Sequence, residues 1–135
     1  MELHLNVIGI VLVLLALGHG LFPRYFDWAN DLGSITLINR QLMYVHTLFI
    51  ALFLLFVGVL CLTSAAEIIG TPLGRRVSLA LAVVWIVRLG IQFAGYSSEL
   101  WRGKTLETIA HVAFSALWTY LSTIFFLVYW NGGTG

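Results

Sequence analysis

Four long apolar stretches, separated by short polar segments, make up most of the chain. They cover roughly residues 5–22, 35–62, 77–97 and 105–130, and each is long enough to form a helix across a bilayer core about 30 Å thick. Pro23 and the segment around Pro72 interrupt the pattern, and Ser34 is the predicted N-cap of the second helix. The pattern therefore predicts an all-α integral membrane protein. Its four transmembrane helices are expected to form an antiparallel up-down bundle with both termini on the same side.

The composition agrees with a membrane protein. Of the 135 residues, 60% are hydrophobic and 10% charged, and the mean hydropathy is +0.96, whereas a soluble domain carries about 25% charged residues. The net charge of +1 provides no basic surface for nucleic acid, which is excluded as a partner. Cys61 is the only cysteine, so an internal disulfide and covalent c-type haem attachment are excluded too.

The segments between the apolar stretches are short, so residues 1–135 are predicted to form a single transmembrane domain. The positive-inside rule assigns the more basic loops to the cytoplasm, and here these are the first and third loops. We expect a multi-pass protein of a bacterial inner membrane. The face that bears the first and third loops carries four cations, Arg24, Arg40, Arg102 and Lys104, whereas the opposite face carries Arg75 and Arg76.

A polar stripe runs along the third predicted helix. Arg88, Gln92, Tyr96 and Glu99 follow one another at intervals of three or four residues, so a helix places them on one face. A charged side chain near the bilayer centre costs roughly 2.5 to 3.5 kcal/mol, so we expect Arg88 to face protein and to have a partner. An ion pair with Glu99 or Glu107 is one possible partner.

Three histidines are predicted to lie at similar depth on the same side of the membrane. Counted from the nearest loop, His19, His46 and His111 are about 6 to 10 Å deep, and Gln92 is about 10 Å deep. Glu107 is one turn before His111 and could orient its ring or bind a metal beside it. The predicted metal ligands are His19, His46, His111 and Glu107, and the predicted cofactor-binding residues are Arg88, Gln92, Arg40 and Tyr96.

Two cofactor hypotheses fit this set. In the first, two of the histidines bind a b-type haem across the bundle, and Arg88 or Arg40 neutralises a propionate. In the second, all three histidines and Glu107 bind a mononuclear zinc, copper or iron ion. A quinone or lipid-like substrate would then fit between the metal and Arg88. Both hypotheses predict redox or electron-transfer chemistry.

A third hypothesis requires no cofactor and no catalysis. The same polar groups serve as a structural network or a proton relay in a small transporter, or in an accessory subunit of a larger membrane complex. Any one of these histidines could equally be a hydrogen-bonding strut between helices. Gly90 and Gly95 permit close helix contact, so a homodimer is a further expectation.

Overall fold

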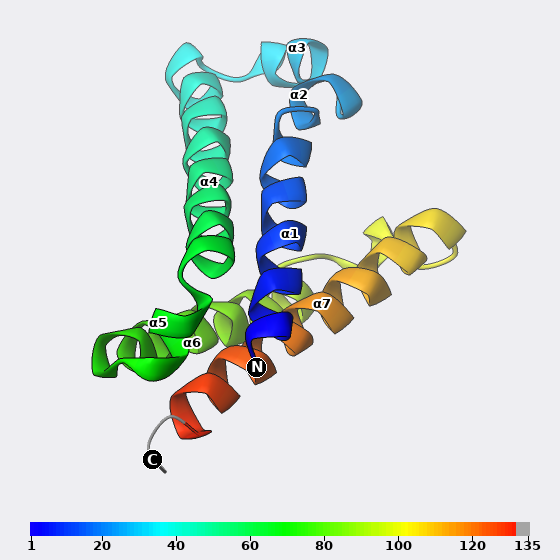
Figure 1. Ribbon diagram of the computed structural model, residues 1–135. Helices are drawn as coiled ribbons and strands as arrows, with labels where there is room; N and C mark the ends of the chain where they lie inside the picture. The colour runs from blue at the N-terminus through cyan, green and yellow to red at the C-terminus, as the bar shows by residue number, and fades with distance from the viewer. Residues whose placement is uncertain (132–135) are drawn as a thin grey trace. The chain divides into compact units, whose positions relative to one another are not determined.

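The computed structural model describes residues 1–131, and every regular element in that range is helical. Four helices are long and apolar enough to cross a membrane: α1 (Glu2–His19), α4 (Leu37–Thr63), α6 (Pro72–Ala94) and α7 (Thr105–Asn131) (Figure 1). The chain is therefore an all-α, multi-pass membrane protein with four long apolar helices. This confirms the fold class predicted from the hydrophobic pattern.

The ends of these helices differ from the prediction by a few residues. Helix α1 ends at His19, three residues early, and Pro23 belongs to a separate short helix, α2 (Phe22–Tyr25). Helix α6 begins at Pro72, five residues early, because the Thr71 side chain accepts a hydrogen bond from the Gly74 amide at 3.0 Å. Proline suits the first turn of a helix, where no amide hydrogen is needed.

Short helices occupy the segments that were predicted as loops. They are α3 (Trp28–Asp31), η1 (Leu32–Ser34), α5 (Ala65–Gly70) and η2 (Ser98–Leu100). The predicted N-cap Ser34 is wrong, since Ser34 ends η1 and Thr36 precedes the first turn of α4. Asp27 adopts a left-handed backbone conformation, φ 48°, between α2 and α3, and its carboxylate accepts a hydrogen bond from Asn30 at 2.7 Å.

The chain divides into two compact units, which we describe separately as the N-terminal hairpin (residues 3–65) and the C-terminal hairpin (residues 66–131). In the N-terminal hairpin, α1 and α4 run antiparallel (Figure 1) and approach most closely at two glycines. A Cβ atom on Gly58 would lie 2.9 Å from the Gly9 carbonyl oxygen, and one on Gly9 would lie 2.8 Å from the Gly58 oxygen. Only glycine allows the backbones this close.

In the C-terminal hairpin, side chains rather than glycines fill the contact between α6 and α7. The indole rings of Trp85 and Trp118 stack at 5.2 Å with an interplanar angle of 3°. Nearer the C-terminus, Arg75 Nε donates to the Tyr129 carbonyl oxygen at 3.3 Å. The buried residues of the two helices include Leu81, Ala82, Trp85, Trp118, Leu121, Phe125 and Val128.

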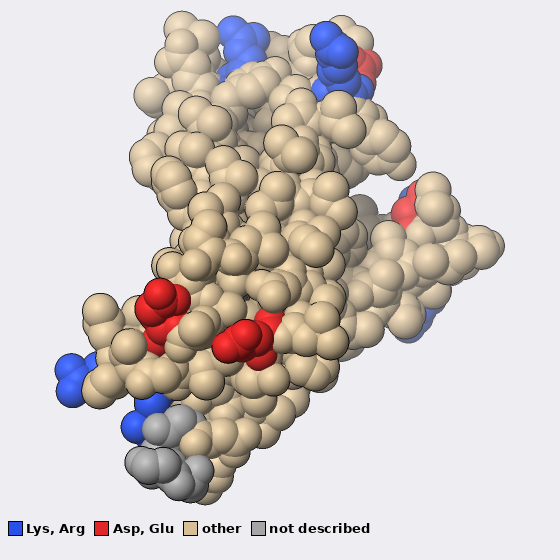
Figure 2. All heavy atoms as spheres, in the orientation of Figure 1, with Lys and Arg blue, Asp and Glu red and all other residues tan. Residues whose placement is uncertain are grey.

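Charged side chains lie mainly near the ends of the long helices. On the face drawn in Figure 2, Lys, Arg, Asp and Glu are confined to those ends, and the lengths between them carry no charge. Uncharged middle sections are what the hydrocarbon core of a bilayer requires. Arg88, in the last third of α6, is the charge that departs from this distribution.

Candidate functional site

Arg88 and Gln92 of α6 face α7. Arg88 Nη1 donates to Gln92 Oε1 at 3.2 Å, and Gln92 Nε2 lies 2.9 Å from His111 Nδ1. Gln92 is buried, while Arg88 and His111 are half-buried. The three side chains form a continuous hydrogen-bonded line from one helix to the other. The expectation that Arg88 faces protein is confirmed.

The order of donors along this line fixes which nitrogen of His111 carries the proton. A guanidinium can only donate, so the oxygen of the Gln92 amide must face Arg88 and its nitrogen must face His111. The amide nitrogen also only donates, so His111 Nδ1 must accept with its lone pair. A neutral imidazole then carries its single ring proton on Nε2. In this arrangement His111 has no free lone pair to offer a metal.

Aromatic rings enclose His111. The Trp101 ring stacks on the imidazole with centroids 4.6 Å apart and planes 13° apart, and the Phe93 ring meets it edge-on at 5.5 Å. Trp101 follows η2, and its carbonyl oxygen accepts a hydrogen bond from Thr108 Oγ1 at 2.6 Å. Helix α7 therefore fixes the position of Trp101, the loop residue that stacks on His111 of the same helix.

Aromatic rings also surround the arginine. The Arg88 Cζ atom lies 5.0 Å from the Trp118 ring centroid and 5.8 Å from that of Tyr96, both within the range of a cation–π interaction. Trp118 is only 5% exposed, and its indole Nε1 is buried without a hydrogen-bond partner among the described residues. A buried polar group without a partner is uncommon in proteins and marks a place where an acceptor would be stabilised.

The acidic residues expected beside Arg88 do not lie there. Helix α6 ends at Ala94, so Glu99 lies in η2, off the predicted stripe, and both Glu99 and Glu107 are exposed. Within residues 1–131, Arg88 forms no ion pair with either. Gln92, not Glu107, is the hydrogen-bond partner of the His111 ring. The cluster thus retains the positive charge of Arg88 without a neighbouring carboxylate.

The N–H groups that are not used in the hydrogen bonds between Arg88, Gln92 and His111 can donate to a ligand. Arg88 has further N–H groups beyond the one bonded to Gln92, and His111 has its Nε2–H. The Trp118 indole N–H is a third donor. We call Arg88, Gln92, His111, Trp101 and Trp118 the α6–α7 cluster. Its chemistry favours a ligand with acceptor oxygens.

Comparison of the chain with protein-family models, curated proteins and solved structures found no match. The site is therefore characterised by its own geometry.

The other two predicted histidine ligands belong to the N-terminal hairpin and have local partners. His19 Nδ1 lies 2.7 Å from the Leu15 carbonyl oxygen, and His46 Nδ1 lies 2.8 Å from that of Leu42, each one turn earlier in its own helix. A carbonyl only accepts, so Nδ1 carries the proton in both rings and Nε2 keeps its lone pair. The tautomer is the reverse of that of His111.

His19 and His46 lie on different sides of the N-terminal hairpin. His19 borders a cavity whose α4 wall is formed by Tyr44, Thr47, Leu48 and Ala51. His46 is exposed and lies on roughly the opposite face of α4, because successive helical residues are about 100° apart. Arg40, a predicted cofactor-binding residue, is half-buried near the start of α4. Residues 1–131 contain no group of three His, Cys, Asp or Glu side chains placed to hold a metal ion.

Trp101 and Phe93, which contact His111, were not predicted as site residues. Phe93 directly follows Gln92 and so lies about 100° away from the Arg88–Gln92 face of the helix, which is why the stripe did not identify it. Trp101 lies in a loop, where no periodicity indicates what it covers. The one indication in the sequence is that Trp101 lies close to the start of α7. It precedes Thr108, its hydrogen-bond partner, by seven residues.

Proposed function

We propose that this protein binds the anionic head group of a lipid-like amphiphile at the α6–α7 cluster. The observation that carries the proposal is a half-buried arginine that, within residues 1–131, has no carboxylate partner, is linked through Gln92 to His111 and packs on an indole whose buried N–H has no partner there. A carboxylate or phosphate accepts hydrogen bonds on several oxygens and would satisfy the remaining donors of Arg88 and His111.

Each residue of the cluster has a distinct part in this proposal. Arg88 supplies the charge, and His111 Nε2–H supplies a directed donor. Gln92 is a positioning residue, because it bonds both of them and thereby sets the orientation of each. Trp101 keeps the imidazole plane in place by stacking on it. Phe93 and Tyr96, which are 64% and 46% exposed, offer ring surface to an apolar chain.

The bilayer is the natural source of such a ligand. The flanks of α6 carry exposed apolar side chains such as Ile86, Val87 and Ile91, and in a membrane these contact lipid. An amphiphile could place its chain along this flank and its head group beside Arg88. The protein would then recognise a membrane component without a domain outside the bilayer.

Quenching of tryptophan fluorescence by brominated lipids tests the proposal. Purified protein in zwitterionic micelles is titrated with a dibrominated fatty acid, and with dibrominated phosphatidylcholine as the net-neutral comparison. We expect saturable quenching by the fatty acid, and about tenfold weaker binding to Arg88→Gln, as for the loss of one charge-assisted hydrogen bond. Arg75→Gln is the matched control, since Arg75 is on the same helix but its Nε bonds a backbone carbonyl.

A second variant separates binding from folding. In Gln92→Glu, a carboxylate stands between Arg88 and His111 and can accept from both, so the helix contact is kept while the positive charge is neutralised internally. We expect this variant to remain folded, as judged by circular dichroism, and to lose fatty-acid binding. Equal affinities of wild type, Arg88→Gln and Gln92→Glu would refute the proposal.

A haem or metal-binding role is the second candidate, and the tautomers of His19 and His46 favour it. Metal-bound histidines usually donate one ring N–H to a carbonyl or carboxylate and bind through the other nitrogen, and both rings have that first bond. Because they lie on different sides of the hairpin, each of these residues would bind haem, zinc, copper or iron separately, through its Nε2. An absorbance spectrum with a Soret band that shifts on reduction would support haem. Metal analysis of wild type and His46→Ala would test the other ions.

A further inference from the structure

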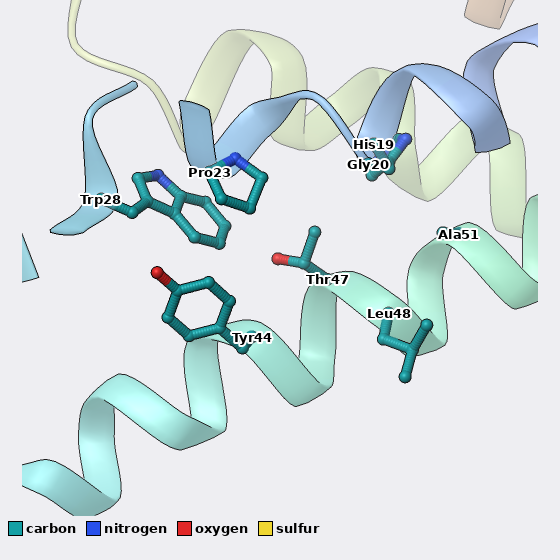
Figure 3. Close-up of a pocket in the computed structure, with 8 residues that line it drawn as sticks. All are labelled: His19, Gly20, Pro23, Trp28, Tyr44, Thr47, Leu48 and Ala51. Atoms are coloured by element: carbon teal, nitrogen blue, oxygen red, sulfur yellow. The ribbon is translucent and has the colours of Figure 1, made fainter. Parts of the chain in front are cut away.

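The N-terminal hairpin contains a cavity of about 170 Å³. It lies between the end of α1, the α2–α3 segment and one face of α4 (Figure 3). Its wall is formed by His19, Gly20, Pro23, Trp28, Tyr44, Thr47, Leu48 and Ala51. All of these residues belong to the same compact unit, so the cavity is a feature of this hairpin alone.

The cavity follows from the way α1 and α4 separate. At Gly9 and Gly58 the two backbones touch, and there is no room for a methyl group. Two turns along α4 from Gly58, the residue facing the cavity is Ala51, whose small side chain does not fill the gap. On the other wall the chain turns at Gly20, immediately after α1 ends at His19.

Two aromatic rings line one side of the cavity. Trp28 of α3 and Tyr44 of α4 meet edge to face with centroids 5.3 Å apart. Figure 3 shows the Thr47 hydroxyl pointing from α4 toward Pro23 and these two rings. A ligand in the cavity would therefore have ring surface beside it and a hydroxyl within its reach.

Thr47 differs from most other serines and threonines of the long helices. Their hydroxyls donate to the carbonyl oxygen four residues earlier, as in Thr63, Ser78, Thr108, Ser115, Thr119, Ser122 and Thr123. Such bonds satisfy a hydroxyl inside an apolar helix. The hydroxyls of Thr47 and Tyr44 have no hydrogen-bond partner among the described residues. Tyr44 is exposed, whereas Thr47 is half-buried, so the Thr47 hydroxyl is the polar group of this cavity that is left to bind a ligand.

We infer that this cavity binds the head group of a lipid-soluble quinone. A cavity of about 150 Å³ accommodates a benzene molecule, so the volume here suits a single six-membered ring with small substituents. The Thr47 hydroxyl can donate to a quinone carbonyl, and Trp28 and Tyr44 provide aromatic neighbours for the ring. Leu48 borders the cavity and is 57% exposed, which gives an apolar tail a way out along the surface of α4.

Two matched ligands and three variants test this site. The probe is a benzoquinone with a decyl tail, and the comparison ligand is decylbenzene, which has the ring and tail but no oxygens. Both are titrated calorimetrically into the full-length protein in detergent micelles. We expect Thr47→Val to weaken quinone binding about five- to tenfold and to leave decylbenzene binding unchanged, because one hydrogen bond is lost and the volume is kept. Ala51→Phe should abolish the binding of both ligands by filling the cavity.

Thr63→Val is the matched control, since Thr63 is on the same helix and its hydroxyl bonds the Val59 carbonyl. We expect it to bind both ligands like the wild type. Quinone binding that is equal in wild type, Thr47→Val and Ala51→Phe would overturn the inference. So would a Thr47→Val variant that weakens both ligands to the same extent. These residues lie outside the α6–α7 cluster, so neither result depends on fatty-acid binding there.

Discussion

The two hairpins join their helices in different ways. In the N-terminal hairpin, α1 and α4 touch through the backbones at Gly9 and Gly58 and leave a cavity farther along. In the C-terminal hairpin, α6 and α7 are joined by stacked indoles and by the hydrogen-bonded line from Arg88 to His111. In a membrane, where lipid is as apolar as a leucine side chain, helix association depends on close packing and on interhelical hydrogen bonds. The N-terminal hairpin relies mainly on close packing, and the C-terminal hairpin adds interhelical hydrogen bonds.

The histidines show the same contrast. His19 and His46 bond to carbonyls of their own helices, so these bonds do not tie one helix to another. His111 bonds to a side chain of a different helix. A residue type alone does not tell which of these two roles a histidine has. The partner decides whether it contributes to tertiary structure, and it also decides which ring nitrogen is free.

Removing the central indole of the C-terminal hairpin should have the largest effect. Trp118 is 5% exposed and contacts Trp85, Arg88 and Phe114. We expect Trp118→Ala to lower the free energy of unfolding by about 3 kcal/mol, the lower end for such truncations because lipid is already apolar. Unfolding in mixed micelles with increasing dodecyl sulfate measures this. Trp130→Ala, at a position that is 64% exposed, should change it by about 0.5 kcal/mol.

Adding a side chain at the glycine contact should have the second-largest effect on stability. In Gly58→Leu, the side chain meets the Gly9 carbonyl oxygen and Val13, so α1 and α4 must move apart. We expect a loss of about 2 kcal/mol in the same assay. Gly90→Leu is the control, because a Cβ atom at Gly90 has no neighbour within 4 Å. A tolerated Gly58→Leu would show that the backbone contact does not hold this hairpin together.

Breaking the hydrogen-bonded line should have a smaller effect. Gln92→Leu keeps the size of the side chain but leaves Arg88 Nη1 and His111 Nδ1 without their shared partner. Interhelical hydrogen bonds in membrane proteins average about 0.6 kcal/mol, and the unpaired arginine adds to this, so we expect a loss of about 1 to 2 kcal/mol. Thermal unfolding followed by circular dichroism would register it. An unchanged stability would mean that Gln92 does not connect the helices.

Removing a locally bonded histidine should have the smallest effect. His46 is exposed, and among residues 1–131 its ring bonds only to the Leu42 carbonyl of its own helix. We expect His46→Leu to change the free energy of unfolding by less than about 0.5 kcal/mol. A loss as large as that of Gln92→Leu would contradict the contrast between the two kinds of histidine.

The helices were predictable from the sequence, because their apolar stretches are long and the bilayer demands a helix for each. The ends of the helices were less predictable. Helix α6 starts at Pro72, after the Thr71 cap, which is earlier than the hydrophobic pattern suggests. A cap acts through one hydrogen bond, which a hydropathy pattern does not detect. Ser34 and Thr36 are both plausible caps, and only the path of η1 decides between them.

The candidate site was predicted in part. The spacing of Arg88 and Gln92 identified a protein-facing stripe, because an arginine in an apolar helix has few acceptable positions. The choice of partner was not predictable, since helical spacing brings Glu107 within reach of His111, whereas the contact with Gln92 depends on how α6 packs against α7. Depth alone did not reveal that His19 and His46 lie on different sides of their hairpin. That depends on how each helix is rotated about its axis.

The tautomers of the histidines test the difference between the hairpins most directly. Nitrogen NMR of the protein labelled with ¹⁵N-histidine, assigned with single histidine variants, identifies the ring nitrogen that carries the proton. We predict the proton on Nε2 in His111 and on Nδ1 in His19 and His46, with the His111 spectrum altered by Gln92→Leu. A proton on Nδ1 of His111, or a His111 spectrum unaffected by that variant, would contradict the hydrogen-bonded line on which the proposed function rests.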